Sequence, residues 1–150
     1  MKLVIPPPVE PERLARVAAA AGPMAVVNAD DDFGRRLAAE VGAVTFSAAG
    51  ADADYRALDI SFDASGSRFF CEGPGASAEI EIRLPGAFNV ANALAAIAIA
   101  GSLGIELRDA AAALGDAEAV PGRFEPIVEG QPFSVLVDYA HTPDSLENVL

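Results

Sequence analysis

Several residue types that often mark function are scarce in this sequence. Its 150 residues include one cysteine, Cys71, one histidine, His141, and no tryptophan. A single cysteine excludes an internal disulfide framework and a cysteine-based zinc site, and it agrees with the reducing cytoplasm. Lys and Arg number 10 against 22 Asp and Glu, which gives a net charge of −12. Because phosphate contacts require basic side chains, we expect no nucleic-acid partner.

Long apolar runs are missing as well. The longest one, residues 93–104, has about 12 residues, whereas a membrane span needs roughly 18. Near the N-terminus the apolar residues 3–5 are stopped by Pro6, and a signal peptide needs an apolar core about twice as long. We therefore expect a cytoplasmic protein without a membrane partner.

Known phosphate-binding and catalytic motifs are also missing from the sequence. It has no G-x-x-x-x-G-K-S/T pattern, no glycine-rich loop of the dinucleotide-binding type and no G-x-S-x-G. A lone histidine provides no catalytic triad, and the sequence has no cluster of metal ligands. We expect no catalytic residue and no metal ligand within these residues, so the chain alone should neither hydrolyse nor transfer a group.

The residues that are present predict an α/β arrangement in the first part of the chain. Residues 24–28 form a short run rich in β-branched side chains, which is typical of a buried parallel strand. The aspartates that follow can cap a helix at 32–41, and residues 44–46 predict the next strand. Another helix is expected at 10–21. Strand, helix and strand at this spacing indicate an α/β sheet.

An antiparallel meander and two helices are predicted next. Residues 55–62, 67–72 and 78–84 alternate polar and apolar side chains between turn residues, so one face of the meander should meet water. Residues 89–103 are apolar on nearly all sides and predict a buried helix. A second helix is expected at 107–114, ended by a glycine.

The pattern breaks at residues 121–125, which are predicted to be a domain boundary. Two short strands beyond it predict a hairpin, and a helix that begins at Ser145 is still running at the last residue. We therefore expect residues 1–119 to be part of one domain and residues 120–150 to be the truncated start of a second, as in a fragment of a longer protein.

The DYAHTPD segment that follows the last strand carries the strongest functional signal. In open α/β sheets, ligands bind beyond the carboxyl ends of strands. Asp138 could therefore accept hydrogen bonds from a ribose diol, while His141 and Thr142 could donate to phosphate or substrate. The alternative is structural: Asp138 and Thr142 organise the turn, and Asp144 or Ser145 caps the helix.

Two asparagines open the predicted buried helix. Asn89 and Asn92 are three residues apart, so they lie on one helix face. A side-chain amide offers both a donor and an acceptor, which suits the edge of adenine. In the alternative, Asn89 is the helix N-cap and Asn92 is a solvated first-turn residue. Capping explains Asn92 poorly, because the rest of that face is apolar.

Two further segments carry weaker signals. Arg123, at the predicted boundary, could reach a nucleotide held between two domains, or it could form an ion pair with Glu125 or another neighbour. The sequence does not decide between these roles. The carboxylates at 30–32 could lie near a Mg²⁺ ion, but turn and cap roles are favoured for them.

Taken in order, four segments of the chain resemble one family. AVVNADDDFG, LPGAFNVANALAAIAIA, PGRFEPI and VLVDYAHTPDSLENVL resemble the Mur ligase family of peptidoglycan synthesis, and within it the UDP-N-acetylmuramoyl-tripeptide synthetase type. The resemblance implies an α/β fold: part of the parallel-sheet central domain with a small antiparallel meander, followed by the first strands of a Rossmann-like C-terminal domain.

The resemblance also implies that the chain contributes to an ATP site. Asn89 and Asn92 would face the adenine, Asp138 would hold the ribose, Arg123 would contact the nucleotide at the hinge, and His141 would lie beside the phosphates. The family's phosphate loop, Mg²⁺ ligands and carbamylated lysine are expected outside this chain, and the resemblance assigns Lys2 no role.

The activity implied is that of an ATP-dependent ligase of peptidoglycan synthesis. Such an enzyme joins an amino acid, meso-diaminopimelate or L-lysine, to UDP-MurNAc-L-Ala-D-Glu through an acyl phosphate. UDP-MurNAc-dipeptide and a free amino acid would be the partners of the full-length protein, and the fragment alone is expected to be inactive. The alternatives are a cyanophycin synthetase or folylpolyglutamate synthase-like ligase, or a non-catalytic module that binds a nucleotide or a partner.

Overall fold

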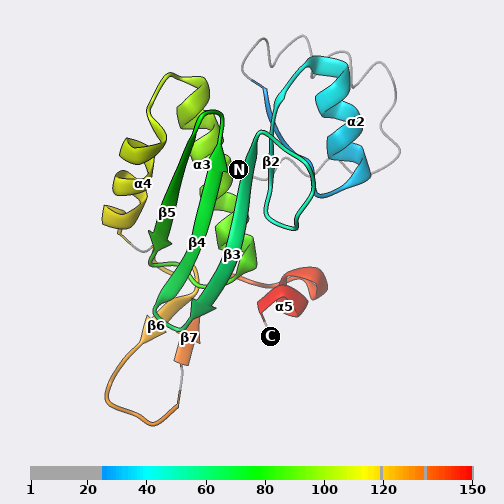
Figure 1. Ribbon diagram of the computed structural model, residues 1–150. Helices are drawn as coiled ribbons and strands as arrows, with labels where there is room; N and C mark the ends of the chain where they lie inside the picture. The colour runs from blue at the N-terminus through cyan, green and yellow to red at the C-terminus, as the bar shows by residue number, and fades with distance from the viewer. Residues whose placement is uncertain (1–24, 119, 134, 150) are drawn as a thin grey trace.

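The computed structural model describes residues 25–118, 120–133 and 135–149 (Figure 1). The main sheet contains, in this order, β1 (Val26–Asn28), β2 (Val44–Ser47), β3 (Tyr55–Asp63), β4 (Gly66–Gly73) and β5 (Ala76–Ile82). A separate two-stranded sheet pairs β6 (Glu125–Ile127) with β7 (Val135–Val137). The helices are α2 (Asp32–Val41), α3 (Ala87–Ser102), α4 (Leu107–Asp116) and α5 (Pro143–Val149). The helix expected at 10–21 lies outside the described residues.

The main sheet combines the two predicted parts into one. β1, β2 and β3 are parallel, whereas β3, β4 and β5 are antiparallel. The α/β unit and the meander are therefore confirmed, and β3 belongs to both, because it pairs with β2 on one side and with β4 on the other. The predicted hairpin near the C-terminus is also confirmed, as the antiparallel pair of β6 and β7.

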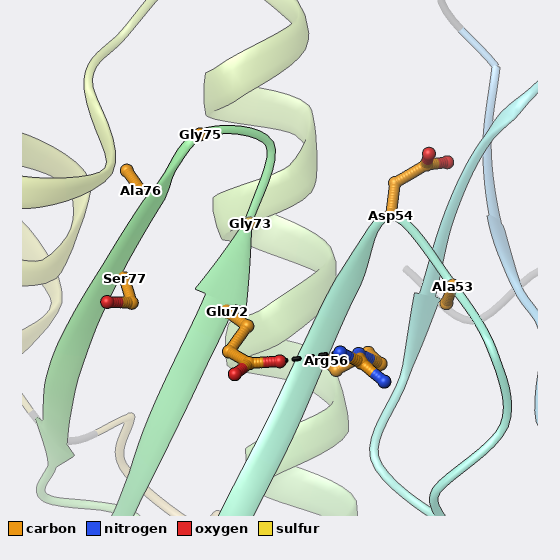
Figure 2. Close-up of a pocket in the computed structure, with 8 residues that line it drawn as sticks. All are labelled: Ala53, Asp54, Arg56, Glu72, Gly73, Gly75, Ala76 and Ser77. Carbon is orange, nitrogen blue, oxygen red and sulfur yellow. Dashed lines mark hydrogen bonds and ion pairs between the residues drawn. The ribbon is translucent and has the colours of Figure 1, made fainter.

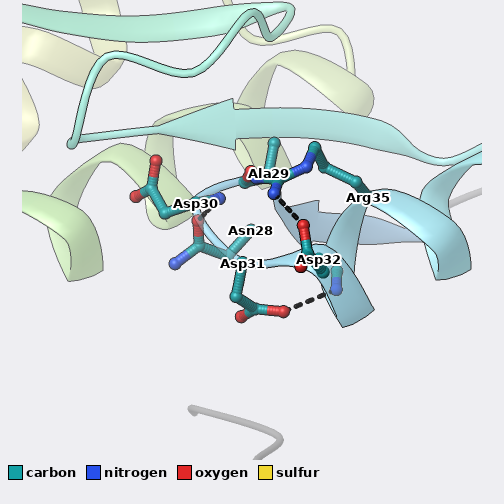
Figure 3. Close-up of polar contacts among 7 residues, drawn as sticks. Asn28, Ala29, Asp30, Asp31, Asp32 and Arg35 are labelled. Atoms are coloured by element: carbon teal, nitrogen blue, oxygen red, sulfur yellow. Dashed lines mark hydrogen bonds and ion pairs between the residues drawn. The ribbon is translucent and has the colours of Figure 1, made fainter.

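Acidic side chains organise the turn from β1 into α2 (Figure 3). Asp31 caps α2, because its carboxylate accepts a hydrogen bond from the Gly34 N–H at 2.7 Å. The neighbouring Asp30 carboxylate accepts from the Ser47 hydroxyl at 2.5 Å and from the Ala48 N–H at 3.0 Å. These two bonds tie the end of β1 to the end of β2. The favoured turn and cap roles of this acidic segment are therefore confirmed.

The hydrophobic core lies between the main sheet and α3. Its fully buried side chains include Phe69, Ile80, Leu94 and Ile97. The prediction of a buried helix is confirmed for the face that meets the sheet, whereas Ile99 on the other face is 50% exposed. Apolar residues surround the helix almost evenly, so the sequence does not show which side meets the sheet.

The ends of three helices differ from the prediction, and α3 covers residues 87–102 instead of 89–103. α4 continues through Gly115 to Asp116, and α5 begins at Pro143 instead of Ser145. Thr142 precedes α5, and its hydroxyl oxygen accepts a hydrogen bond from the Ser145 N–H at 3.2 Å. Thr142 therefore organises this turn as one alternative predicted. None of the helices in the described ranges is long and apolar enough to cross a membrane.

Gly34 is a stability-critical glycine in the first turn of α2. A Cβ atom at this position would lie 1.8 Å from the carbonyl oxygen of Asn28. That oxygen belongs to the backbone and cannot move away without displacing the chain around it. We expect Gly34→Ala to lower the free energy of unfolding by about 2 kcal/mol or more. Gly115→Ala is the matched control, because its Cβ would meet the Glu81 carbonyl oxygen at an ordinary 3.7 Å. The control should gain up to about 1 kcal/mol from helix propensity. Urea unfolding followed by circular dichroism measures both, and equal effects would contradict the close contact.

Because of Cys71, the stability of the chain depends on pH in the alkaline range. Burial, with a smaller contribution from the charge of Glu72, raises the thiol pKa to about 11. An unfolded thiol titrates at about pH 8.5. The native state therefore keeps a proton that the unfolded state loses, and the stabilisation is complete below the unfolded pKa and disappears as the pH rises through the folded pKa.

We expect the free energy of unfolding to fall by roughly 2–3 kcal/mol between pH 8.5 and pH 11 because of this thiol. Urea unfolding at a series of pH values, compared with Cys71→Ala, isolates the contribution. Burial also raises the pKa of the Tyr55 phenol, and the charge of Cys71 adds to that shift. The comparison with Cys71→Ala therefore measures the thiol together with its repulsion of this phenol. Parallel pH curves for the two proteins would rule out the thiol as the cause.

Candidate functional site

The five predicted ATP-binding residues fall into two groups that meet at the start of α3. Asn89 and Asn92 lie in its first turns, while the others lie in the segment that contains β6, β7 and α5. Phe88 and Phe124 join the groups, because their rings pack edge to face with centroids 5.6 Å apart. The amides and the DYAHTPD segment are therefore connected through one aromatic contact.

The asparagine group borders a small cavity between the end of β5, α3 and α4. The cavity has a volume of about 200 Å³, and both asparagines line it. Its walls are mainly apolar and include Leu84, Ala93 and Leu114. Apolar walls with a few polar groups are typical of sites for small ligands. The cavity can therefore hold an apolar or aromatic group whose polar edge meets an amide.

Asn89 has a structural role in addition to lining this cavity. It is buried, and its Nδ2 donates a hydrogen bond to the Pro85 carbonyl oxygen at 2.9 Å. The alternative that Asn89 is the N-cap was wrong, because α3 begins two residues earlier and Gly86 occupies the cap position with a φ of 101°. Asn92 is exposed, which leaves it the better placed of the two to meet a ligand.

Asp138 organises the turn after β7. Its Oδ2 accepts a hydrogen bond from the Phe124 N–H at 2.9 Å, and its Oδ1 accepts from the Ala140 N–H at 2.7 Å. The structural alternative for Asp138 is therefore confirmed. It does not remove the ligand-binding role, because each carboxylate oxygen has a second lone pair that can accept from a hydroxyl.

Tyr139 lies between the two remaining predicted residues. The Arg123 guanidinium is 5.4 Å from the centroid of the Tyr139 ring, and the His141 ring is 5.0 Å from it at 65°. The alternative ion pair of Arg123 with Glu125 does not form, since Glu125 instead accepts from the Gly122 N–H at 2.7 Å. Arg123 is exposed, so its charge is available to an anionic ligand.

The hydrogen bond of His141 limits its possible chemistry. Its Nδ1 lies 2.9 Å from the Tyr139 carbonyl oxygen, which can only accept. The bond therefore requires a proton on Nδ1, and the neutral ring then presents Nε2 as an acceptor. His141 can donate to a phosphate through Nε2 only when the imidazole is doubly protonated.

Sequence reasoning missed three aromatic residues of this site, which are Phe88, Phe124 and Tyr139. Each is the immediate neighbour of a predicted residue, so its position in the sequence was a usable signal. What the sequence lacked was the pairing of rings from segments far apart in the chain, which only the fold establishes.

A second, polar groove of about 420 Å³ lies over the face of the meander that is turned away from α3 (Figure 2). Arg56 and Glu72 face each other across β3 and β4 in this groove, as an ion pair of 2.6 Å. None of the five predicted residues lines it. In the part of the chain that the structure describes, no group of three His, Cys, Asp or Glu side chains could hold a metal ion.

Comparison with known proteins identifies the family. The model of the Mur ligase middle domain matches residues 14–100. The chain therefore belongs to the Mur ligase family. A UDP-N-acetylmuramoyl-L-alanyl-D-glutamate–2,6-diaminopimelate ligase of Streptomyces coelicolor is 46% identical over 131 residues, which are 85% of this chain and 26% of that protein. A UDP-N-acetylmuramyl-tripeptide synthetase of Roseiflexus is 45% identical over 146 residues, which are 92% of this chain and 29% of that protein.

Solved structures of the same class share the fold. A structure of a UDP-N-acetylmuramoyl-L-alanyl-D-glutamate–2,6-diaminopimelate ligase superposes with a TM-score of 0.73 at 26% identity, over 99% of this chain and 33% of that one. The folylpolyglutamate synthetase of Lactobacillus casei superposes with a TM-score of 0.66 over 94% of this chain and 38% of that one. At 18% identity, this second likeness shows the fold alone. The chain spans between a quarter and a third of the curated relatives described here.

The Phe88–Phe124 contact can be tested by a double-mutant cycle. We expect Phe88→Ala and Phe124→Ala to show a coupling energy of about 0.5–1.5 kcal/mol in urea unfolding, because an edge-to-face ring pair contributes about that much beyond its buried area. The control cycle combines Phe88→Ala with Phe133→Ala, since Phe133 is 66% exposed. It should show no coupling. Zero coupling in the first cycle would mean that the rings do not join the two groups in solution.

Proposed function

We infer that this chain binds the adenosine part of ATP in a ligase that joins an amino acid to UDP-MurNAc-L-Ala-D-Glu. The observation that carries this proposal is the cavity lined by Asn89 and Asn92, connected through the two phenylalanine rings to Asp138. Because the chain covers only 26% of the Streptomyces coelicolor relative, the activity of the whole protein is part of the proposal.

The residues of the site fit a nucleoside. The apolar cavity suits a base, and the Asn92 amide can pair with the N6 and N7 edge of adenine, which asparagine recognises in other settings. Asp138 offers the ribose hydroxyls an acceptor whose orientation is already fixed by two backbone N–H groups. Arg123 and His141 would lie on the phosphate side.

The work of this chain would be to bind and orient the nucleotide. Bound ATP supplies the phosphoryl group that activates the acceptor carboxylate of such ligases. We assign Mg²⁺ no ligand among the described residues, and we propose that the chain alone is inactive. The division into residues 1–119 and 120–150 and the cytoplasmic location belong to the same proposal.

The names of the relatives favour 2,6-diaminopimelate over L-lysine as the amino acid. The Streptomyces coelicolor relative is named for diaminopimelate, at 46% identity. The chain resembles a folylpolyglutamate synthetase only in fold. The ligase of a UDP-MurNAc-peptide is therefore better supported than the folylpolyglutamate synthase-like alternative.

A chimera tests the whole-protein activity. The 131-residue segment of the Streptomyces coelicolor ligase that matches this chain is replaced by the chain, and ligation of diaminopimelate is followed by phosphate release. We expect an active chimera in which Asn92→Ala raises the KM for ATP about tenfold or more, with a smaller change in kcat, because a hydrogen bond to the base is lost. Ser77→Ala, on an exposed strand position away from the cavity, should leave both constants unchanged.

Binding to the chain itself provides an independent measurement. Adenosine is the probe, because it is neutral and needs no phosphate site. Amide shifts in NMR titrations should map to the start of α3 and to the turn after β7, and Asn92→Ala should weaken them while Ser77→Ala does not. Shifts confined to the polar groove of Arg56 and Glu72 would contradict the proposed site.

A further inference from the structure

Phe124 has an unusual backbone conformation for its residue type. Its φ is 52°, and in the described part of the chain only one other non-glycine residue, Asp59, has a positive φ. In this left-handed region the Cβ of an ordinary L-residue approaches the following carbonyl oxygen. A bulky residue adopts it only where its surroundings enforce it, and such positions cluster at functional sites.

Two contacts hold Phe124 in this conformation. On one side, its ring packs on Phe88 at the start of α3. On the other, its N–H donates to Oδ2 of Asp138 at 2.9 Å. The turn that precedes it is also closed, because the Arg123 N–H donates to the Val120 carbonyl oxygen at 3.0 Å. The strained residue is thus fixed through both its side chain and its backbone.

The left-handed conformation directs the ring and the N–H of Phe124, and the preceding residue, toward different parts of the site. The Phe124 ring reaches the helix that carries the two asparagines, its N–H reaches the carboxylate after β7, and the adjacent Arg123 lies over the Tyr139 ring. With an ordinary negative φ, the N–H of residue 124 would point away from Asp138 while the ring packs on Phe88.

We propose that Phe124 is a positioning residue: its left-handed backbone aims the N–H that orients the Asp138 carboxylate toward the ribose of the nucleotide. The proposal rests on the proposed function, because it takes the ribose contact of Asp138 as given. Phe124 itself touches no reacting group and acts only through the carboxylate.

Two substitutions both remove the ring and differ in the backbone conformation that they allow. Phe124→Val keeps an apolar residue, but a β-branched side chain strongly disfavours a positive φ. Phe124→Asn loses the ring, but asparagine tolerates the left-handed region and keeps the N–H. If the backbone conformation orients Asp138, the valine variant should be impaired and the asparagine variant should be largely restored.

The readout is the ratio of the dissociation constants of 2′,3′-dideoxyadenosine and adenosine, measured by NMR titration of the chain. This ratio isolates the ribose hydroxyls, and it does not change when a variant merely lowers the folded fraction, since both probes meet the same protein. We expect a ratio of about tenfold or more for the unchanged chain, because hydroxyls that donate to a carboxylate form charge-assisted hydrogen bonds. Phe124→Val should reduce it to about twofold or less, and Phe124→Asn should stay near the original value.

Hydrogen exchange of the amide of residue 124 is measured in parallel and requires no ligand. Exchange should be slow in the unchanged chain and in Phe124→Asn, and at least about tenfold faster in Phe124→Val. A full ratio together with slow exchange in the valine variant would overturn the positioning role. An equal loss in both variants would overturn it as well, because the ring and not the backbone would then be responsible.

The same data distinguish a failure of the proposed function from a failure of the role proposed for Phe124. If the unchanged chain binds adenosine and the dideoxy analogue equally well, the ribose role of Asp138 is wrong, and the positioning role falls with it. If the unchanged chain discriminates between them and the valine variant keeps this discrimination, the proposed function stands and the role of Phe124 alone is rejected.

Discussion

The packing of α3 against one face of the main sheet is the interaction on which the rest of the structure depends. Leu94 and Ile97 of the helix are fully buried in that interface. The helix also approaches β3 closely, because Gly101 leaves room for the Tyr55 hydroxyl, which a Cβ there would meet at 2.0 Å. This packing fixes the axis of α3 and therefore the place of its first two turns, where Phe88 and the two asparagines begin the candidate site.

The C-terminal segment adds little stability of its own. Its two strands pair over three residues each and are largely exposed, and an isolated hairpin of this kind is at best marginally stable in water. Its attachment to the main fold therefore depends on a few specific contacts, of which the Phe88–Phe124 ring pair is one. The position of Asp138 relative to α3 depends on such contacts, because no residue of this segment belongs to the buried core cluster of the described residues.

The sequence was sufficient where local signals agreed. The helix Asp32–Val41 was predicted with its observed bounds, because an aspartate cap precedes it and a glycine follows it. Alternation and turn residues likewise located the three strands of the meander. The double pairing of β3, the exposed face of α3 and the positive φ of Phe124 could not be predicted, because each depends on contacts between distant segments.

The candidate site also shows why the structural and the functional interpretations of one residue need not compete. Both Asp138 oxygens accept backbone N–H groups, and Asn89 donates to the Pro85 carbonyl oxygen. Such bonds use only part of the capacity of each side chain and leave further lone pairs for a ligand. Because they hold the polar groups in one orientation before binding, less conformational entropy is lost when a ligand arrives. A carboxylate that organises its own turn is for this reason a better ribose acceptor than one that rotates freely in water.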